Sequence, residues 1–334
     1  MVPTHELAVQ VADVFQSFSR NTSLRIMALY GGVKQADQIE RLSSGVDVLV
    51  TTPGRMFDLR AQGFLKLDFV EILVLDEADH MLDLGFLHDI YDVLKYIPAK
   101  RQTLFFSATI DDSIKKIAYT IVHKPIRIQI SPKDPVSKNV DHCVMYVEMD
   151  EKRFFLERIV KEHPSSKILT FVRTKVRSER VQKALRRVGI ESIVMHGGLD
   201  QSERSKVLEQ FKNGSTLVMV ATDVSGRGID IPNVEYVVNY DLPEKMEYYV
   251  HRVGRTGRGE NRGQAISFCS NEEKSILEDI ESWIGSKIAV LELDRVDREG
   301  VVLATEEKKY DLKKLLKEIE ENENQQRKKR KKKR

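Results

Sequence analysis

Three carboxylates follow an apolar run in the first third of the chain. The run spans Ile72 to Leu75, and the acids are Asp76, Glu77 and Asp79. A continuous aliphatic run predicts a strand buried on both faces of a parallel sheet. Ligands of such sheets gather outside the carboxyl ends of the strands, where these acids fall. Because hard cations prefer oxygen ligands, the pattern indicates a magnesium ion that also touches phosphate oxygens. A solvated acidic turn is the alternative.

Length and composition indicate a two-domain protein without a membrane segment. The 334 residues exceed one ordinary domain, and 41% of them are hydrophobic, enough for two cores. No apolar run approaches the roughly eighteen residues of a membrane span, and the first residues lack a signal-peptide pattern. Cys143 and Cys269 stand in apolar surroundings without metal-ligand spacing. Two lone cysteines fit a reducing compartment, so a cytoplasmic location is expected.

The last residues form a basic tail. Arg327 to Arg334 are all lysine or arginine, and without them the net charge of +3 becomes negative. Like charges in a row repel one another, so disorder is expected over 295–334, with a possible short helix at 311–320. Such a tail binds polyanions through counterion release, without sequence preference. A solubility tail or a nuclear address is the alternative.

Strands and helices alternate along the rest of the chain. This alternation predicts an α/β fold with two tandem parallel-sheet domains. The expected domains are 1–130 and 140–294, joined by a proline-containing linker at 131–139. Besides the acidic strand, strands are predicted at 24–30, 47–52, 102–106, 167–172, 192–195, 216–221, 235–239 and 264–268, the last of which closes the second sheet. Helices are predicted from residue 3 to about 18, after the 167–172 strand as far as residue 185, at 201–211, and from about 246 onward.

Short motifs stand at the ends of these strands in a fixed order. In the first domain they are Pro3-Thr-His-Glu-Leu-Ala8, Gly31-Gly32, Thr52-Pro-Gly-Arg55, Asp76-Glu-Ala-Asp79 and Ser107-Ala-Thr109. In the second they are Phe171-Val-Arg-Thr174, His196-Gly197, Gln201 with Arg204, Ala221 to Asp230, and His251 to Arg258. Together they closely resemble the DEAD-box RNA helicases, a superfamily 2 branch with two RecA-like domains. The short core and basic tail look like bacterial helicases of the RhlE type.

The resemblance implies an ATP site with Mg²⁺. Asp76 would hold the ion through water, and Glu77, also beside the metal, would orient or deprotonate the attacking water. Arg255 and Arg258 would reach the γ-phosphate as arginine fingers, since their spacing places them near one helical face. Further nucleotide contacts are implied for Asp230, at the ribose, and Gly228. A polar relay linking ATP state to domain closure is implied for Asp79, Ser107, Thr109 and His251.

The resemblance also implies an RNA surface built from small, hydroxyl and arginine residues. Small residues let backbone amides approach phosphates. The implied contacts are Pro3, Thr4, Gly31, Gly32, Thr52, Gly54, Arg55, Arg173, Gly197, Gln201, Arg204 and Thr222. Because few aromatic residues stand among them, binding to single strands and short duplexes should be weakly sequence-selective and strongly salt-dependent. A monomer is expected, and the sequence names no protein partner.

The chain departs from the family pattern in three places. The family carries an adenine-reading segment and a Gly-Lys-Thr phosphate loop upstream of the Pro-Thr-x-Glu-Leu-Ala motif, but no Gly-Lys dipeptide occurs here. We therefore expect an N-terminally truncated chain that binds ATP poorly and does not turn it over. A missing strand beside the acidic strand should leave unpaired backbone next to Asp76, a frayed first domain and an intact second one. His5 replaces the usual arginine, and Ser225-Gly226 replaces Ala-Ala.

Two function classes follow. One is an ATP-dependent RNA helicase that separates short duplexes by local strand bending. The other is a non-catalytic RNA-binding or scaffold protein that uses the second domain and the basic tail. The retained acids and arginines favour the first, and the missing loop favours the second. A DNA-directed superfamily 2 enzyme is disfavoured by the wording of the acidic and Ser-Ala-Thr motifs.

Overall fold

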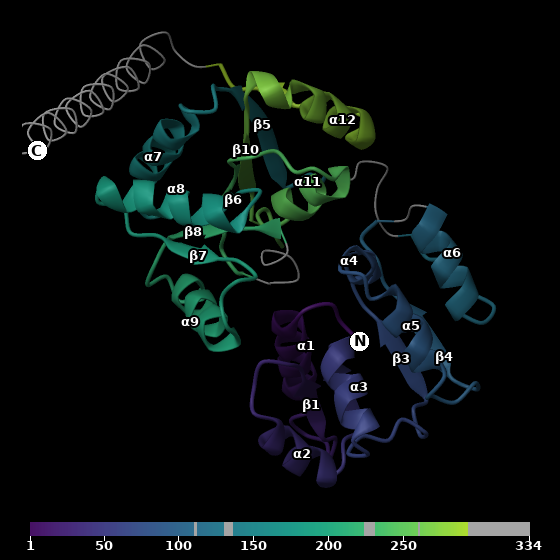
Figure 1. Cartoon of the computed structure of the whole chain (residues 1–334). Coiled ribbons are helices and arrows are strands. Elements are labelled where there is room, and N and C mark those ends of the chain that lie inside the picture. Colours follow the sequence, from purple (N-terminus) through teal and green to yellow (C-terminus); the bar gives the residue numbers. More distant parts are fainter. Residues whose placement is uncertain (110–111, 130–135, 224–230, 260, 293–334) are drawn as a thin grey trace, which may run out of the picture. The chain divides into compact units, whose positions relative to one another are not determined.

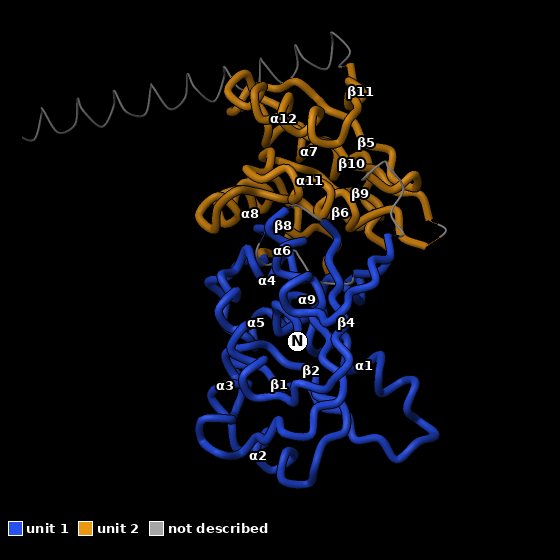
Figure 2. Tube along the Cα trace, turned by 90° about the vertical axis from the view of Figure 1, so that its right-hand side faces the viewer, with its two compact units in different colours: residues 1–135, 195–215, 221–232 blue, residues 136–194, 216–220, 233–334 orange. Residues whose placement is uncertain are grey.

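Along the described residues, helices largely alternate with short strands (Figure 1). The structure is a computed structural model that describes all residues except 110–111, 130–135, 224–230, 260 and 293–334. It divides into two compact units (Figure 2), residues 1–135, 195–215 and 221–232 in one and residues 136–194, 216–220 and 233–334 in the other. The predicted division around a linker at 131–139 stays a prediction, since most of that linker and the whole predicted tail lie outside the described residues.

Among its described residues, the first unit contains two pairs of short strands. Its elements along the chain are α1 (His5–Phe18), β1 (Ile26–Leu29), α2 (Gln35–Ser43), β2 (Val48–Thr51), α3 (Pro53–Ala61), β3 (Ile72–Leu75), α4 (Ala78–Asp83), α5 (Leu87–Leu94), β4 (Gln102–Phe105) and α6 (Asp112–Ile121). Helix α9 (Gln201–Lys212) groups with this unit. Strand β1 pairs with β2, and β3 with β4, both in parallel.

Met1 and Val2 run between these two strand pairs. The Val2 amide donates to the Thr51 carbonyl at 3.0 Å, on the β2 side. On the β3 side the Met1 amine donates to the Val74 carbonyl at 2.6 Å, and the Asp76 amide donates to the Met1 carbonyl at 3.1 Å. The expectation of unpaired backbone next to Asp76 was therefore wrong, because Met1 occupies that edge of β3.

Helix α1 begins where the sequence predicts. Thr4 is its N-cap, and the Thr4 hydroxyl accepts a hydrogen bond from the Leu7 amide at 3.3 Å. A capping hydroxyl satisfies one of the amides that the first turn leaves without a partner. The fully buried Ala8 faces a small core with Ile26 and Val50, which fixes the start of the helix against β1 and β2.

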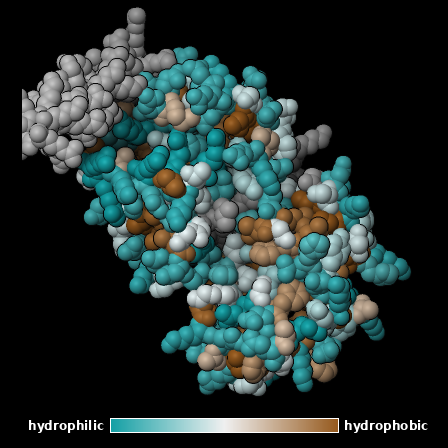
Figure 3. All heavy atoms as spheres, in the orientation of Figure 1, coloured by the Kyte–Doolittle hydropathy of each residue, from teal (hydrophilic) through white to brown (hydrophobic). Residues whose placement is uncertain are grey.

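Large apolar side chains remain exposed on the first unit. Phe18, Phe69 and Ile126 are 81%, 87% and 88% exposed. Figure 3 shows apolar side chains gathered in patches on an otherwise largely hydrophilic face. The main core of the first unit, by contrast, is well packed around Leu29 and Leu75, both at 0% exposure.

The second half of the chain forms a seven-stranded sheet. Its elements are β5 (Val140–Tyr146), α7 (Lys152–Glu162), β6 (Ile168–Phe171), α8 (Lys175–Arg187), β7 (Ile193–Met195), β8 (Val218–Ala221), β9 (Tyr236–Asn239), α11 (Met246–Val253), β10 (Gly263–Cys269), the short 3-10 helix η1 (Asn271–Glu273), α12 (Lys274–Ile284) and β11 (Ala289–Val290). The strand order is β11-β5-β10-β9-β6-β8-β7.

The predicted closing strand does not lie at the edge of this sheet. Strand β10 pairs in parallel with β9 on one side and with β5 on the other, and β11 lies beyond β5. The prediction was wrong because β5 follows a proline-rich segment and its apolar residues lack a clean alternation. The core beneath the sheet includes Phe155 and Leu156 of α7 packed against Phe268 of β10.

Both cysteines lie in this second sheet. Cys269 is buried at the end of β10, and burial raises the pKa of its thiol to about 11. Cys143 in β5 is partly buried, and burial again raises the pKa of the thiol. Among the described residues, no helix combines the length and apolar character required to span a bilayer.

Candidate functional site

The acidic strand ends in a tight, left-handed turn. Glu77 follows Asp76 with φ 47° and ψ 50°, a conformation that costs a non-glycine residue roughly 1 kcal/mol. The turn is held by the neighbouring strand, because the Phe106 amide donates to the Leu75 carbonyl at 2.8 Å and the Ala78 amide to the Phe106 carbonyl at 3.0 Å. Strain held in place by neighbouring hydrogen bonds is typical of functional turns.

Asp79 ties this turn to the segment after β4. One Asp79 oxygen, Oδ2, accepts from the Thr109 hydroxyl at 2.9 Å and from the Thr109 amide at 3.1 Å. The Ser107 hydroxyl donates to the Thr109 carbonyl at 2.6 Å. Asp79 is 6% exposed, so these bonds satisfy a carboxylate that water scarcely reaches. The structure thus joins three of the four residues predicted for the relay within the first unit. The fourth, His251, lies in the second unit.

Asp76 is a half-buried acid whose pKa is not influenced by any lysine or arginine among the described residues. Burial is the main factor that raises the pKa of Asp76, and the nearby Glu77 and Asp79 carboxylates also raise it, against the opposing effects of the Glu77 amide and the Met1 ammonium. The Glu77 carboxylate lies 3.3 Å from Nδ1 of the buried His80, a neighbour that the sequence did not single out. A cation bound at this site would favour the charged form of the Asp76 carboxylate.

These carboxylates fit a magnesium ion that shares its ligands with phosphate. Within the described residues, no three His, Cys, Asp or Glu side chains converge as a metal cage. Mg²⁺ does not need one, because it keeps several waters and binds one or two carboxylates together with substrate phosphates. Asp76 and Glu77 supply that number of acids at the end of β3.

Five of the predicted RNA residues line one cavity in the first unit. The cavity measures about 360 Å³ and is lined by Pro3, His5, Gly31, Thr52, Gly54, Arg55, Asp58 and Phe86. The missing side chain at Gly54 leaves open space, since a Cβ there would meet nothing within 4 Å. Thr52 is the N-cap of α3, and its side chain makes no capping hydrogen bond. Phe86 and Asp58 were missed, because neither belongs to a strand-end motif.

Arg55 is held at the wall of this cavity. Its Nη1 donates to the Gln38 side-chain oxygen at 2.7 Å, and its Nη2 donates to the Val33 carbonyl at 3.3 Å. Its Nε lies 3.9 Å from an Asp58 carboxylate oxygen, beyond hydrogen-bond range. The guanidinium is thus oriented mainly by neutral acceptors, with Asp58 as an ion-pair partner beyond hydrogen-bond range.

Gln201 and Arg204 lie on α9, within the same unit. The Arg204 Nε donates to a Glu6 carboxylate oxygen at 2.7 Å. Burial alone would raise the pKa of Glu6, but its bonds with Arg204 lower it overall. Gln201 Oε1 lies 3.0 Å from the His5 ring nitrogen, and its Cβ would lie 3.0 Å from a Cβ at Gly32.

Two other predicted RNA residues stand at strand ends outside the cavity. Gly197 is exposed with open space around its Cα. Thr222 follows β8, and its amide donates to the Met195 carbonyl at 3.1 Å. Asp230, Gly228 and the Ser225-Gly226 pair lie outside the described residues.

In the second unit, two predicted phosphate-binding arginines follow α11. The Nε of Arg255 donates to the His251 carbonyl and that of Arg258 to the Gly254 carbonyl, both at 3.1 Å. Cations at a helix C-terminus are stabilised by its carbonyls, so each side chain is oriented by the helix it follows.

The loop that carries these arginines is tightly packed. Gly257 has φ +64°, and a Cβ there would lie 2.7 Å from the Asn139 carbonyl oxygen. The Asn139 side chain in turn donates to the Gly259 carbonyl at 2.8 Å. Only glycine fits this conformation and this approach, which explains Gly257 between Arg255 and Arg258.

Arg173 stands at the end of β6 beside a buried charged cluster. Its amide donates to an Asp241 carboxylate oxygen at 3.1 Å. Lys152 and Glu273 complete the cluster and are 0% and 2% exposed. The sequence did not indicate these residues, because they come from segments far apart in the chain. A lysine that opens an amphipathic helix on its apolar side was the one available signal.

The fold and these strand-end sites define a class of protein. Alternating helices and parallel strands, with acids after one strand and arginines after a helix of the second sheet, are features of tandem RecA-like nucleotide-dependent proteins. Residues 1–117 match the DEAD/DEAH box helicase family, and residues 151–260 match the helicase conserved C-terminal domain. The chain belongs to the DEAD-box helicase family.

Curated relatives agree with this assignment. The chain is 40% identical over 292 residues to the ATP-dependent RNA helicase CshA of Listeria monocytogenes, a match that covers 87% of this chain and 56% of that protein. It is 38% identical over 296 residues to the ATP-dependent RNA helicase RhlB of Shewanella baltica, covering 88% of this chain and 68% of the relative. The chain therefore spans roughly half to two thirds of the length of these relatives.

Solved structures agree as well. S. cerevisiae Dbp5 bound to RNA and ADP BeF3 matches with a TM-score of 0.82 at 30% identity, over 91% of this chain and 80% of that one. Mss116p bound to single-stranded RNA and AMP-PNP matches with a TM-score of 0.78 at 25% identity, over 91% of this chain and 66% of that one. The predicted α/β fold with tandem RecA-like units is confirmed.

Proposed function

We propose that this chain carries most of the machinery of an ATP-dependent RNA helicase that separates short duplexes locally. Its acids, arginines and RNA-facing residues would act with ATP and Mg²⁺. The observation that carries the proposal is the bond between Asp79 and Thr109, which joins the acidic strand end to the Ser-Ala-Thr segment within 3.1 Å. An acidic turn with no further role has no need of such a buried tie.

The acid turn supplies the hydrolytic half of the site. A magnesium ion, when bound, would neutralise charge on the phosphate oxygens. Asp76 would contribute one carboxylate toward it, through water. Glu77 would accept a proton from the attacking water, and His80, 3.3 Å away, would hold the Glu77 carboxylate in position. Arg255 and Arg258 would stabilise charge on the transferred phosphoryl group.

The cavity of the first unit would bind the RNA backbone. Its glycines allow close approach, and Arg55 supplies an oriented charge. Phosphate contacts of this kind read no sequence, so binding should be weakly selective and steeply salt-dependent. The RNA-bound Dbp5 and Mss116p structures support this proposal by analogy of fold. A cytoplasmic location and a monomeric state stay predictions.

RNA-stimulated phosphate release tests the proposal. The 334 residues contain no Gly-Lys dipeptide, so they should release little or no phosphate by themselves. A version extended before Met1 by a relative's segment that carries a Gly-Lys-Thr loop should turn over ATP when RNA is added. Glu77→Gln in that extended chain should lower turnover by about 10² to 10⁴-fold. A matched control, Glu71→Gln, changes another acid on the same segment and should leave turnover nearly unchanged.

Two outcomes would contradict the proposal in different ways. Robust phosphate release by the unextended chain would show that the Gly-Lys-Thr loop is not needed for turnover. An extended chain that folds and binds RNA, yet has no turnover sensitive to Glu77→Gln, would favour the non-catalytic RNA-binding alternative.

A further inference from the structure

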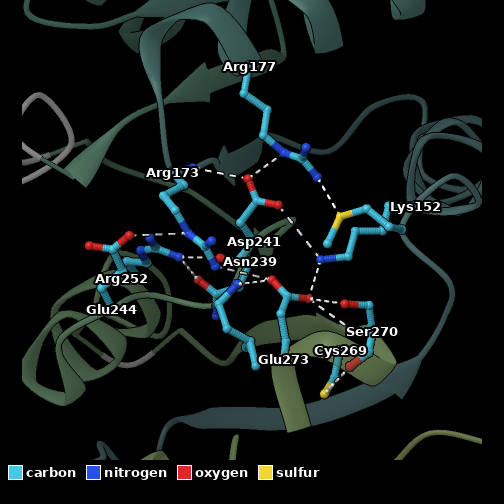
Figure 4. Close-up of polar contacts among 12 residues, drawn as sticks. Lys152, Arg173, Arg177, Asn239, Asp241, Glu244, Arg252, Cys269, Ser270 and Glu273 are labelled. Carbon is cyan, nitrogen blue, oxygen red and sulfur yellow. Dashed lines mark hydrogen bonds and ion pairs between the residues drawn. The ribbon is translucent and has the colours of Figure 1, made fainter. Parts of the chain in front are cut away.

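A cluster of buried charges lies beneath Arg173 in the second unit (Figure 4). At its centre the ammonium of Lys152 lies 2.5 Å from a Glu273 carboxylate oxygen and 3.7 Å from an Asp241 carboxylate oxygen. The three residues come from α7, η1 and the segment after β9. Burying charges is costly unless they are paired and hydrogen-bonded. The pairing of each acid therefore determines whether Arg173 is needed to neutralise it.

The two buried acids are satisfied without the Arg173 side chain. Glu273 is paired with Lys152, and it also accepts from the Ser270 hydroxyl at 3.0 Å. Burial would raise the pKa of Glu273, but Lys152 and Ser270 together lower it. Asp241 is paired with Nε of Arg177 at 2.6 Å. Each buried carboxylate thus has a cation of its own.

The guanidinium of Arg173 is held only loosely. Its Nη2 lies 3.6 Å from Glu273, and its Nε lies 3.6 Å from Glu244. Both distances exceed those of a hydrogen bond. The Arg173 side chain is 38% exposed and that of Glu244 is 72% exposed, so their attraction is screened by water. A phosphate that accepts direct hydrogen bonds from Arg173 would bind it more strongly than either acid does.

We propose that Glu244 sets the RNA affinity of this chain by competing with phosphate for Arg173, and that Lys152 allows the exchange by neutralising Glu273. RNA binding would move Arg173 from two weak ion pairs to one phosphate. Lys152 keeps Glu273 paired when Arg173 leaves. The proposal rests on the proposed RNA contact of Arg173 and adds to it a residue that weakens the contact.

RNA binding by the full chain tests the role of Glu244. The probe is a fluorescein-labelled single-stranded RNA of about ten nucleotides, followed by anisotropy at fixed salt. Arg173→Ala should weaken binding by about three- to ten-fold, the loss of one phosphate contact. Glu244→Gln should tighten it by about two- to five-fold, the scale of an exposed ion pair. In the Arg173→Ala background the gain from Glu244→Gln should vanish.

A matched variant separates this effect from overall charge. Glu191→Gln removes the same charge from an exposed glutamate that precedes β7, at the opposite end of the sheet strands from Arg173. It should tighten binding by less than half as much as Glu244→Gln. The basic tail is present in every variant, so its contribution cancels from the ratios.

Each result then has one meaning. If Arg173→Ala weakens binding but Glu244→Gln leaves it unchanged, the competition is disproved and the proposed RNA contact stands. If Arg173→Ala leaves binding unchanged, the RNA contact itself is wrong, and this inference fails with it. If the gain from Glu244→Gln persists without Arg173, or equals that of Glu191→Gln, it is long-range electrostatics and the competition is overturned.

Lys152 is tested by changing one or both members of its pair. Lys152→Met leaves Glu273 with Arg173 as its nearest cation, so Arg173 is retained and RNA affinity should fall toward that of Arg173→Ala. Lys152→Met with Glu273→Gln removes both charges and should restore affinity to within about two-fold of wild type. A folded double variant that binds as weakly as Lys152→Met would overturn the role of Lys152. If Lys152→Met does not fold, the double variant compared with Glu273→Gln alone gives the same decision, since both lack the carboxylate and should bind alike.

Discussion

Two acids, half-buried Asp76 in the first unit and buried Glu273 in the second, have pKa values shifted in opposite directions. The pKa of Asp76 is raised by its partial burial and by the neighbouring Glu77 and Asp79 carboxylates, which the Glu77 amide and the Met1 ammonium offset only in part. The pKa of Glu273 is lowered, because Lys152 and Ser270 more than offset burial. An acid left short of positive charge is prepared for a bound cation, whereas an acid with its own lysine is a structural element.

The sheets around these acids differ in how continuous they are. Among the described residues, the strands of the first unit form two separate pairs joined through Met1 and Val2, whereas the second sheet is continuous over seven strands. Most of the highly exposed large apolar side chains also belong to the first unit. The first unit should therefore open at lower free energy, and limited proteolysis should cut 1–130 before 140–270.

The largest expected effect comes from removing Lys152, the cation paired with Glu273. Lys152→Met should lower the unfolding free energy of the second unit by about 3 to 5 kcal/mol, since it leaves the buried Glu273 carboxylate without its cation. Trp283, the single tryptophan of the chain, lies in α12 and reports urea unfolding of this unit by fluorescence. Lys161→Met breaks an exposed pair with Glu157 and should cost less than about 1 kcal/mol. Equal losses in the two variants would mean that the buried pair contributes nothing special.

A smaller loss is expected at the tie between the acidic turn and its neighbour. Thr109→Val removes the hydroxyl that Asp79 accepts at 2.9 Å and should destabilise the first unit by about 1 to 3 kcal/mol. Hydrogen exchange of peptides that cover β3 and β4 measures the change. Thr120→Val removes an exposed hydroxyl bonded to the Lys116 carbonyl and serves as the control. Unchanged exchange around β3 would show that the remaining amide bond suffices.

Neutralising Asp76 should change stability in the opposite direction from neutralising Glu273. Asp76→Asn removes a half-buried charge that has no lysine or arginine partner, so it should stabilise the first unit by up to about 1 kcal/mol while it removes ATP turnover from the extended chain. Glu273→Gln, by contrast, should destabilise the second unit. Denaturant unfolding followed by hydrogen exchange compares the two, and a loss of stability in Asp76→Asn would break the distinction between the two acids.

The smallest effect is on the pH dependence of the second unit. Because the folded pKa of Glu273 lies below its ordinary value of 4.5, its contribution is present above that pH and is lost as the pH falls through the lowered pKa. The free energy of unfolding, followed by Trp283 fluorescence, should therefore fall more steeply with decreasing pH for wild type than for the double variant Lys152→Met with Glu273→Gln. Parallel curves would assign the acid sensitivity to other carboxylates.

Much of the fold follows from local patterns in the sequence. The strands that end in motifs appear within a residue or two of prediction, because each is a short apolar run bounded by small or charged residues, as at Ile72–Leu75. Helix α1 and its Thr4 cap follow from the same kind of local pattern. Strand β5 was missed, because the pattern of Val140–Tyr146 mixes polar and apolar residues on both faces.

The candidate site was predictable where motifs carry it and not where distant segments meet. The acidic turn and its Thr109 neighbour were named from motifs. Lys152 and Glu273 are 121 residues apart and meet only through the folding of the second sheet. Their pairing depends on three-dimensional packing that no local pattern encodes.

The two cysteines have a practical consequence. Only the thiolate reacts with maleimides, and burial raises the pKa of both Cys143 and Cys269, the second to about 11. Near neutral pH both therefore stay mostly protonated and poorly reactive. Cysteines introduced at exposed positions such as Gln16 in the first unit and Glu191 in the second should be labelled ahead of them. Dye pairs for single-molecule distance measurements can thus be attached without first removing the native thiols.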